Sequence, residues 1–543
     1  MSVVVEPVDD TTREVGPARL PPGDDVQALE AWLDGVVHRH SVIGIAAAVI
    51  KQGQPSRFAS RGLASIAERR PATEDTVFRI ASVTKLVTAI AVMQLVERGL
   101  VDLDAPANDA LRAYRLVIAK PGHRPATLRH LLTHTAGIPE VVHLRDVFHP
   151  GWGPFMSRPA IASVAIGEPL PSLRSYYGAA LRCVVEPGTV FAYSNHGFAT
   201  LGQVLEDVTG EPLDRLYRER IFEPLGMVDT DFARSARMAA RRATGYEFGR
   251  RGPEPVADRL WLGSAGGGIY STARDLARLG AALLESNADG AAAGGRILET
   301  GSLAALVAPS FQPVPQLPGV GLGCFRGDVD GHPTFSHDGL LPGFAAILLV
   351  APDDGTALVA MTTGAPGAHS WLPVEIDGLL RELLGLPASE EKPHGSFPQH
   401  PERWPDLCGR YALPPRISDL RGRLGLAGVD VGVRGGRLTA TIRTPIPGLS
   451  RTFELLPDDP DDPDVFRVDL RPLGVPMTRV VFARGPGRRP IAAYTDLLLQ
   501  VFQKVPAERR PRPWLGGALG ALAVAAALRA ARGRAHAGEE TSP

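Results

Sequence analysis

Apolar and polar positions along the chain predict a first domain with strands at both ends and helices between them. The first apolar positions recur at helical spacing: Val26, Leu29, Trp32, Leu33, Val36 and Val37. A buried strand then follows from Ile43 to Ile50, and an apolar run from Val83 to Val96 predicts a helix that ends at Arg98-Gly99. Near the other end, the pattern predicts strands at Ala345–Val350 and Ala357–Thr363 and a helix at Glu375–Leu384. This order indicates an α+β arrangement, in which an antiparallel sheet and a helical lobe enclose a site between them.

A second pattern begins after a proline-rich stretch at 387–402. Alternating valines at 429, 431 and 433 precede Gly435-Gly436, and alternation resumes at 438, 440 and 442, which is typical of a β-hairpin. Further strand-like sequence covers 465–470 and 478–482. We therefore expect a small antiparallel β-barrel. The predicted parts are a flexible N-terminus (1–24), a first domain (25–386), a linker (387–402), the barrel (403–505) and a tail (506–543).

The tail has an apolar segment, residues 514–528, with arginines on both sides. Spanning a bilayer takes about 20 apolar residues, and this segment is shorter. We favour a flexible tail with a marginal helix, although the positive flanks and the Gly516-x-x-x-Gly520 spacing also permit peripheral membrane association, a tail anchor or self-association. The N-terminus lacks a basic-then-apolar signal peptide, so a cytoplasmic location is expected.

Charge and cysteine usage exclude several classes of protein. The formal net charge is -1, from 58 basic and 59 acidic residues, so we expect no nucleic-acid partner. The 3 cysteines are far apart and odd in number, which predicts no disulfide framework. The pair His130 and His134 has a spacing that can bind a metal on a helix, but no acid lies between them and no third ligand is evident. We expect no metal and no cofactor.

Candidate chemistry begins at Ser82-Val83-Thr84-Lys85, where the apolar helix starts. Residues three apart share a helix face, so the Ser82 hydroxyl and the Lys85 amine should point into the same space. A serine becomes a good nucleophile when a neighbour accepts its proton, and a lysine with a lowered pKa can do so. The same spacing occurs at Ser389 to Lys392, but that polar stretch runs into prolines and is interpreted as linker.

Two later motifs, Tyr193-Ser194-Asn195 and His337-Asp338-Gly339, complete the set. With them the chain resembles the serine β-lactamase and penicillin-binding-protein superfamily, in particular the class C β-lactamases with their esterase and D-aminopeptidase relatives. Residues 79–85, 128–137 and 266–276 carry the likeness further, over roughly residues 25–385. The resemblance implies a β-lactamase/transpeptidase-like fold for the first domain. The barrel resembles the lipocalin-like C-terminal domains of some D-aminopeptidase relatives.

Each motif then acquires an expected role. A phenol beside a lysine can lose its proton more easily, so Tyr193 is the natural partner of Lys85, and the resemblance implies the same. The amide of Asn195 can donate to a substrate carbonyl or hold Lys85 in place. By resemblance, the backbone N–H groups of Ser82 and Leu340 form the oxyanion hole.

The third motif is expected at a strand edge beside the site. There His337 would orient substrate, and Gly339 would let a substrate backbone approach closely. The β-lactamases carry Lys-Thr-Gly at this position, whereas this chain has a histidine and an acid. A carboxylate at Asp338 would repel a substrate carboxylate, so the motif favours esters or small amides over penicillins and free C-termini.

The sequence thus predicts a serine hydrolase that cleaves a small ester, amide or D-amino-acid peptide through an acyl-enzyme on Ser82. One alternative is a D-aminopeptidase or a D-Ala-D-Ala carboxypeptidase-type cell-wall peptidase. An alternative of another class is a non-catalytic penicillin-binding receptor or scaffold. A proline- and glycine-rich segment at 141–175 is expected to wall the pocket with apolar side chains.

Overall fold

The structure is a computed structural model of the whole chain. It describes these residues: 25–140, 142–143, 163–232, 235–249, 251–285, 296–387, 397–414, 428–442, 450–473, 477–485, 489–496 and 501–506. Three segments discussed above lie outside the described residues: the apolar part of the tail, the linker segment Ser389–Lys392 and most of the expected pocket wall at 141–175.

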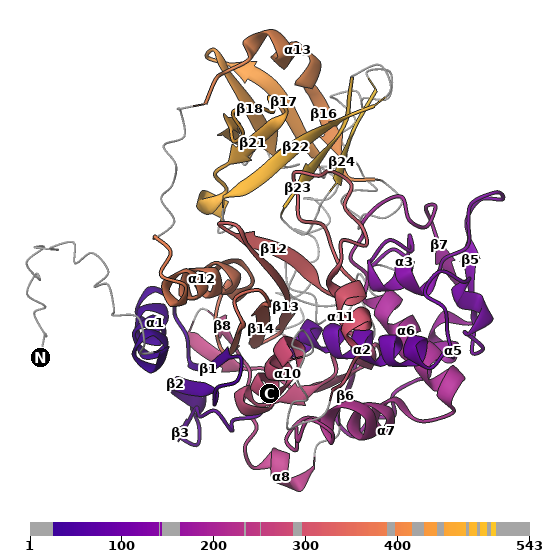
Figure 1. Cartoon of the computed structure of the whole chain (residues 1–543), viewed down its shortest axis with the longest axis vertical. Helices are drawn as coiled ribbons and strands as arrows, with labels where there is room; N and C mark the ends of the chain where they lie inside the picture. Colours follow the sequence, from indigo (N-terminus) through magenta and orange to yellow (C-terminus); the bar gives the residue numbers. More distant parts are fainter. Residues whose placement is uncertain are drawn as a thin grey trace, which may run out of the picture.

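The first domain is built on a seven-stranded antiparallel sheet (Figure 1). Its strands lie in the order β12 (Phe325–Val329), β13 (His332–Leu341), β14 (Phe344–Ala351), β15 (Thr356–Thr363), β1 (Gly44–Lys51), β2 (Arg57–Ser65) and β3 (Arg70–Pro71). The N-terminal strand β1 thus pairs with the C-terminal strand β15, from Gly44 opposite Thr363 to Lys51 opposite Thr356. This pairing closes the domain and confirms the expected sheet at both ends of the sequence.

Helices cover both faces of the sheet, which explains why β1, β14 and β15 are apolar almost throughout. One face packs against α1 (Asp25–Arg39) and α12 (Ala368–Leu383). The other face packs against α10 (Ala273–Glu285) and the helical lobe. Helix α12 begins seven residues before the predicted start at Glu375, because Ala368 and Leu372 are buried against the sheet despite Pro373.

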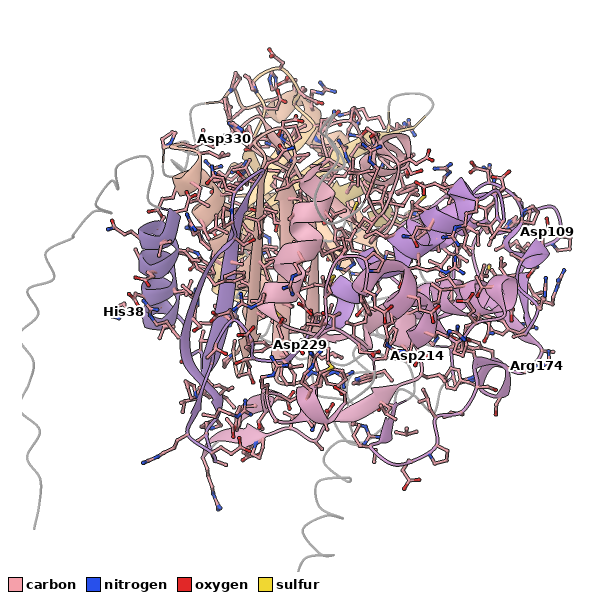
Figure 2. All side chains as sticks on the ribbon, turned by 60° about the horizontal axis from the view of Figure 1, so that its bottom comes forward. His38, Asp109, Arg174, Asp214, Asp229 and Asp330 are labelled. Atoms are coloured by element: carbon pink, nitrogen blue, oxygen red, sulfur yellow. The ribbon has the colours of Figure 1, made fainter. Side chains whose placement is uncertain are left out.

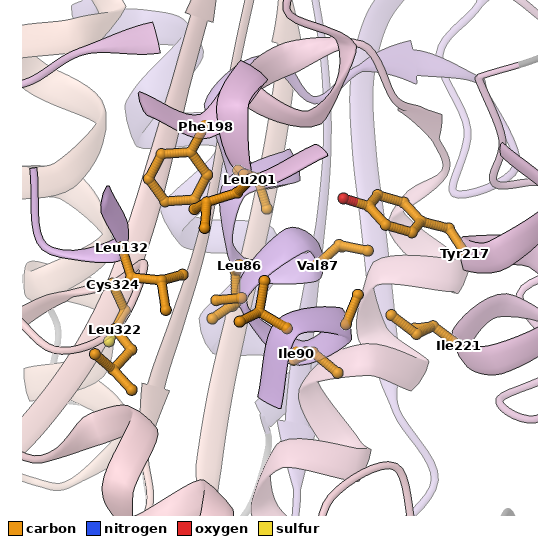
Figure 3. Close-up of a cluster of buried hydrophobic side chains, with 14 of the residues drawn as sticks. Leu86, Val87, Ile90, Leu132, Phe198, Leu201, Tyr217, Ile221, Leu322 and Cys324 are labelled. Carbon is orange, nitrogen blue, oxygen red and sulfur yellow. The ribbon is translucent and has the colours of Figure 1, made fainter. Parts of the chain in front are cut away.

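The helical lobe surrounds α2 (Thr84–Glu97), which is buried on every side. Its Leu86, Val87 and Ile90 lie between Phe198 and Leu201 of α6 (Asn195–Thr209) and the Tyr217 and Ile221 side chains (Figure 3). The rest of the lobe comprises the short helices α3 (Leu128–Leu132), α5 (Leu173–Tyr177), α7 (Leu213–Tyr217), α8 (Ala236–Ala239), α9 (Ser264–Gly267) and α11 (Thr300–Val307), a π-helical turn at Arg218–Phe222 and a 3₁₀ turn, η2, at Ala107–Asp109.

Small two-stranded sheets occur outside the main sheet. They join β4 (Phe78–Arg79) with β11 (Tyr270–Ser271), β5 (Arg115–Ile118) with β7 (Ala180–Cys183), β6 (Ser163–Ala165) with β10 (Arg259–Trp261), and β8 (Tyr246–Gly249) with β9 (Gly252–Pro255). The β4–β11 pair matters for the site, because Phe78 and Arg79 lead directly into the segment that bears Ser82.

The C-terminal domain is a nearly closed antiparallel barrel at the top of Figure 1. Its nine strands follow the order β19 (Arg451–Glu454), β18 (Arg437–Ile442), β17 (Gly428–Arg434), β16 (Gly409–Ala412), β24 (Val501–Lys504), β23 (Pro490–Thr495), β22 (Thr478–Arg484), β21 (Val465–Val468) and β20 (Leu456–Pro457). The predicted hairpin is present, and Gly435 and Gly436 at its turn have φ of 58° and 75°. A short helix, α13 (Trp404–Leu407), packs onto the barrel core.

The barrel also packs against the first domain. Val465 and Val481 share a buried cluster with Phe191, Val314 and Leu317. The Gln316 side-chain amide also donates to Asp462 at 2.6 Å. This contact matters for function because Phe191 lies two residues before Tyr193.

The labelled His38, Asp109 and Arg174 are exposed at the outside of the molecule (Figure 2). In the part of the chain that the structure describes, no helix has the length and apolar character needed to cross a membrane.

Candidate active site

Ser82 lies in a 3₁₀ turn, η1 (Ala81–Val83), which runs directly into α2. The residue before it, Ala81, has a φ of 47°, a left-handed conformation that costs about 1–3 kcal/mol in a residue other than glycine. Such strain persists where surrounding structure holds the backbone in place. The Lys85 ammonium nitrogen Nζ lies 3.0 Å from Ser82 Oγ, so the predicted shared helix face brings the two groups together.

Lys85 is fully buried, and its ammonium hydrogen bonds to Ser82 and to two further groups of this site. Its Nζ donates to Asn195 Oδ1 at 2.8 Å and to the carbonyl oxygen of Gly266 in α9 at 2.6 Å. Burial lowers the pKa of Lys85 to about 7, while the carboxylates of Glu140 and Asp338 act in the opposite direction. Near neutral pH, a substantial fraction of the molecules therefore carries a neutral Lys85 amine beside the serine.

Tyr193 completes the central cluster. Its hydroxyl donates to Ser82 Oγ at 2.8 Å, and Lys85 Nζ lies 4.8 Å from the centre of its ring. Burial raises the pKa of Tyr193 well above its usual value, because it penalises a phenolate more than the hydrogen bond with Ser82 favours one, and the carboxylates of Asp338 and Glu140 add to the rise. This direction runs against the expectation that the phenol would lose its proton more easily.

Asn195 is the first residue of α6. Its amide nitrogen donates to Glu140 Oε1 at 2.7 Å, and its backbone N–H donates to Glu140 Oε2 at 2.8 Å. Because Glu140 occupies the amide donor, the geometry favours holding Lys85 over binding a substrate carbonyl.

His337 lies on β13 with 2% of its surface exposed, and its ring faces the Phe325 and Tyr193 rings at 5.2 and 6.5 Å. Its Nδ1 lies 2.6 Å from the carbonyl oxygen of Asp338. Burial, and then the charge of Lys85, lower the pKa of His337 to about 3. The ring is neutral at physiological pH, and its burial beside Tyr193 and Phe325 suits a supporting role, while the contact with substrate stays a prediction.

The open edge of β13 begins at this histidine. Strand β12 pairs with residues 332–336, whereas the following residues, to Leu341, pair with β14 on the opposite side. A Cβ on Gly339 would lie 2.2 Å from the carbonyl oxygen of Ile80 and 2.8 Å from the backbone nitrogen of Ser82. The close approach of the protein's own backbone therefore requires a glycine here, and the expected approach of a substrate backbone stays a prediction. The oxyanion hole of Ser82 and Leu340 stays a prediction.

Asp338 is half-buried on the same strand, and among the described residues no salt bridge joins it to a cation. Burial raises the pKa of its carboxyl, and the charge of Lys85 partly offsets this rise. The sequence placed an acid in the motif, and the structure puts that acid within electrostatic reach of Lys85.

Three parts of this site were missed by sequence reasoning. The Gly266 carbonyl is a backbone group that carries no residue signal, and Glu140 follows the turn after Gly137 without a recognisable spacing. His134 was considered only as part of a possible metal pair, yet its ring stacks on Tyr193 with 4.3 Å between ring centres.

No group of three or more potential ligands that could hold a metal occurs among the described residues. His130 accepts the backbone N–H of Thr127 at 3.2 Å within a helix-capping box, and His134 accepts that of Ser194 at 3.1 Å. Each histidine therefore has a hydrogen-bonding role that does not involve a metal.

Comparison with known proteins agrees with this architecture. The family model described as Beta-lactamase matches residues 29–374, so the chain belongs to this family. Among curated proteins, it is 31% identical to Penicillin-binding protein 4 of Amycolatopsis lactamdurans over 396 residues, which cover 70% of this chain and 95% of that protein. It is 35% identical to esterase EstB of Burkholderia gladioli over 237 residues, 42% of this chain and 56% of EstB. The chain thus spans little more than half of EstB.

Among solved structures, the chain is similar to the D-amino acid amidase from Ochrobactrum anthropi complexed with L-phenylalanine amide. The TM-score is 0.51 at 26% identity, and the match covers 67% of this chain and 99% of the amidase.

Proposed function

We propose that this protein is a serine hydrolase that cleaves an ester or small amide through an acyl-enzyme on Ser82. One observation carries the proposal. Ser82 Oγ lies within hydrogen-bonding distance of both Lys85 Nζ (3.0 Å) and the Tyr193 hydroxyl (2.8 Å) in a cluster walled by buried residues. A nucleophile with two proton-handling neighbours is the arrangement that acyl transfer needs.

Acylation begins with Lys85 in its neutral form. Its amine accepts the proton of the Ser82 hydroxyl as Oγ bonds to the substrate carbonyl carbon, and the carbonyl oxygen becomes an oxyanion. The Tyr193 phenol, which keeps its own proton at neutral pH, stabilises the forming alkoxide by donating to it. Its hydroxyl then passes a proton to the departing oxygen or nitrogen and recovers one from the Lys85 ammonium.

Deacylation repeats these steps with water. The amine of Lys85, neutral again, accepts a proton from a water molecule through Tyr193, and the new hydroxyl oxygen attacks the acyl carbon. The bond from Ser82 Oγ to that carbon breaks, the serine regains its proton, and the acid is released. No part of this cycle calls for a metal or a cofactor.

The charge beside the site supports a choice of substrate. Among the described residues, the Asp338 carboxylate forms no salt bridge with a cation. It would therefore repel a substrate that carries a carboxylate, but not one that is neutral or carries an ammonium group. This favours esters and small amides over substrates that end in a free carboxylate. It also favours, as the second candidate, a D-amino-acid amidase or D-aminopeptidase activity, which the likeness to the Ochrobactrum enzyme supports.

The test is labelling followed by turnover. A fluorophosphonate and a fluorescent penicillin should be offered to the protein and to its Ser82→Ala variant, followed by p-nitrophenyl esters and D-amino-acid anilides. We expect fluorophosphonate labelling and ester turnover that the variant loses. Ser82-dependent labelling by the penicillin without turnover of any substrate would support the receptor alternative. Faster cleavage of anilides than of esters would support the second candidate.

A further inference from the structure

We propose that His134 is a positioning residue for Tyr193: it fixes the catalytic phenol against Ser82 through contacts on both sides of that tyrosine. The inference rests on the proposed function, because it assigns a task to a residue that supports the proposed proton transfer. His134 does not touch Ser82 or the place of a substrate carbonyl in any contact that the structure gives, so its action is through Tyr193.

Three separate contacts join His134 to the tyrosine segment. The carbonyl oxygen of His134 accepts the backbone N–H of Ala192 at 2.8 Å, and its ring Nδ1 accepts that of Ser194 at 3.1 Å. The imidazole also stacks on the Tyr193 ring with 4.3 Å between centres and 29° between planes. The residues immediately before and after the tyrosine and the tyrosine ring itself are thus all held by one residue.

The backbone of His134 is adapted to this task. Its φ is 56°, in the left-handed region that costs roughly 1–2 kcal/mol for a residue other than glycine. An ordinary turn would place glycine or asparagine here. A histidine in this conformation is expected where the side chain itself is needed, since non-glycine strain of this kind clusters at functional sites.

The contact to Ser194 also defines the protonation state of the ring. A backbone N–H can only donate, so Nδ1 must carry a lone pair, and the ring is therefore neutral with its proton on Nε2. The surroundings are consistent with that state. The Phe191 and Phe198 rings lie 5.7 and 5.0 Å from the imidazole, and burial lowers the pKa of His134 well below its usual value.

The titratable groups around the ring act in the same direction. They are Lys85 on α2 and His337 on β13, and their positive charges would lower the pKa of His134 further. Tyr193 lies between the imidazole and Lys85 and is neutral. The contacts of His134 with residues 192–194 therefore stay intact across the pH range in which Lys85 titrates. A catalytic group displaced by about 1 Å can lose about 100-fold in rate, so this positioning matters for the chemistry.

Two substitutions of His134 separate the effect of its hydrogen bond with Ser194 from the effect of the volume that its side chain fills. Asparagine can place its amide oxygen where Nδ1 lies and tolerates a left-handed backbone, whereas glutamine places its oxygen nearer the position of Nε2. We expect His134→Asn to keep kcat within about 10-fold of the parent and His134→Gln to lose about 100-fold, with KM for a p-nitrophenyl ester changed by less than about 3-fold in both.

A double-mutant cycle with Tyr193→Phe supplies the readout that a merely structural role would not move. If His134 acts through the phenol, each His134 substitution should reduce kcat in the parent and have little further effect once the hydroxyl is gone. Equal losses in both backgrounds, or a His134→Gln variant as active as the parent, would overturn the proposal. If His134→Gln does not fold by circular dichroism, the cycle with His134→Asn decides, because loss of the ring should still cost several-fold in the parent alone.

His130→Asn is the matched control, because His130 lies on the same turn and accepts a backbone N–H from Thr127, not from the tyrosine segment. It should lower the melting temperature without changing kcat. The two proposals fail in different ways. If the parent protein shows no turnover that depends on Ser82, the proposed function fails; if the parent turns over and the cycle is additive, only the role of His134 fails.

Discussion

Asn195 accepts a hydrogen bond from the Lys85 ammonium at 2.8 Å while its own amide nitrogen donates to Glu140 at 2.7 Å. The Asn195 amide thus lies between the Lys85 amine and the Glu140 carboxylate and hydrogen bonds to both, so that the two charged groups do not form a direct ion pair. A direct pair would favour the charged amine, whereas the intervening amide leaves burial as the dominant influence on the pKa of Lys85.

Replacing this amide should change the protonation of Lys85. In Asn195→Asp, a second carboxylate would lie beside Lys85, raise its pKa and move the acid limb of kcat/KM to higher pH, with about a 10- to 100-fold loss of activity at pH 7. The measurement is a pH–rate profile with a p-nitrophenyl ester. Gln203→Ala provides the control, since Gln203 lies two turns further along α6 and hydrogen bonds to Asp207 instead. An acid limb at the same pH as in the parent would contradict the prediction.

The unsubstituted protein should itself show an acid limb near pH 7. Burial lowers the pKa of Lys85 from 10.5 to about 7, so the amine is protonated below this pH and cannot accept the proton of Ser82. Activity should rise roughly tenfold per pH unit below the pKa and level off above it. The plot of kcat/KM against pH reports this group in the free enzyme. A flat profile between pH 5 and about 8 would mean that another group accepts the proton.

Asp338 should influence both this limb and the choice of substrate. Its carboxylate raises the pKa of Lys85, so Asp338→Asn should move the acid limb to lower pH. The same substitution removes a repulsive charge, so KM for an ester that carries a free carboxylate should fall by about 10-fold, while KM for a neutral ester should hardly change. If both KM values respond equally, the carboxylate does not select by charge.

The sequence alone predicted the fold class and the order of the motifs, because apolar periodicity and three short motifs can be recognised without knowing which residues are in contact. It failed where burial decides the outcome. The pattern placed a lysine beside a tyrosine and suggested an acidic phenol, but the phenol lies in surroundings too apolar to hold a charge. It likewise could not find the Gly266 carbonyl, since a backbone oxygen becomes a ligand only when α9 is packed beside α2. The predicted helix start at Glu375 was too late, because the burial of Ala368 and Leu372 against the sheet was not evident from the pattern.

Gly339 should tolerate no side chain. In Gly339→Ala, the new Cβ would lie 2.2 Å from the Ile80 carbonyl oxygen and 2.8 Å from the Ser82 nitrogen, so β13 or the serine turn must move. We expect a loss of about 1–3 kcal/mol in the free energy of unfolding and of at least about 100-fold in kcat. Gly378→Ala is the matched control, because a Cβ there meets nothing within 4 Å in helix α12. It should stabilise the protein slightly and leave kcat unchanged.

Two neighbouring valines on β22 can separate the stability of the barrel from its effect on catalysis. Val480 belongs to the core of the barrel, whereas Val481 packs against Phe191, two residues before the catalytic tyrosine. Because successive side chains on a strand point to opposite faces, each substitution affects one cluster. Val481→Ala should lower kcat several-fold by loosening the tyrosine segment. Val480→Ala should lower the melting temperature at least as much as Val481→Ala does, at unchanged kcat, because it removes two buried methyl groups at a cost of about 1 kcal/mol each. Equal kcat values for the two variants would show that the barrel contact does not reach Tyr193, and the barrel would then contribute stability alone.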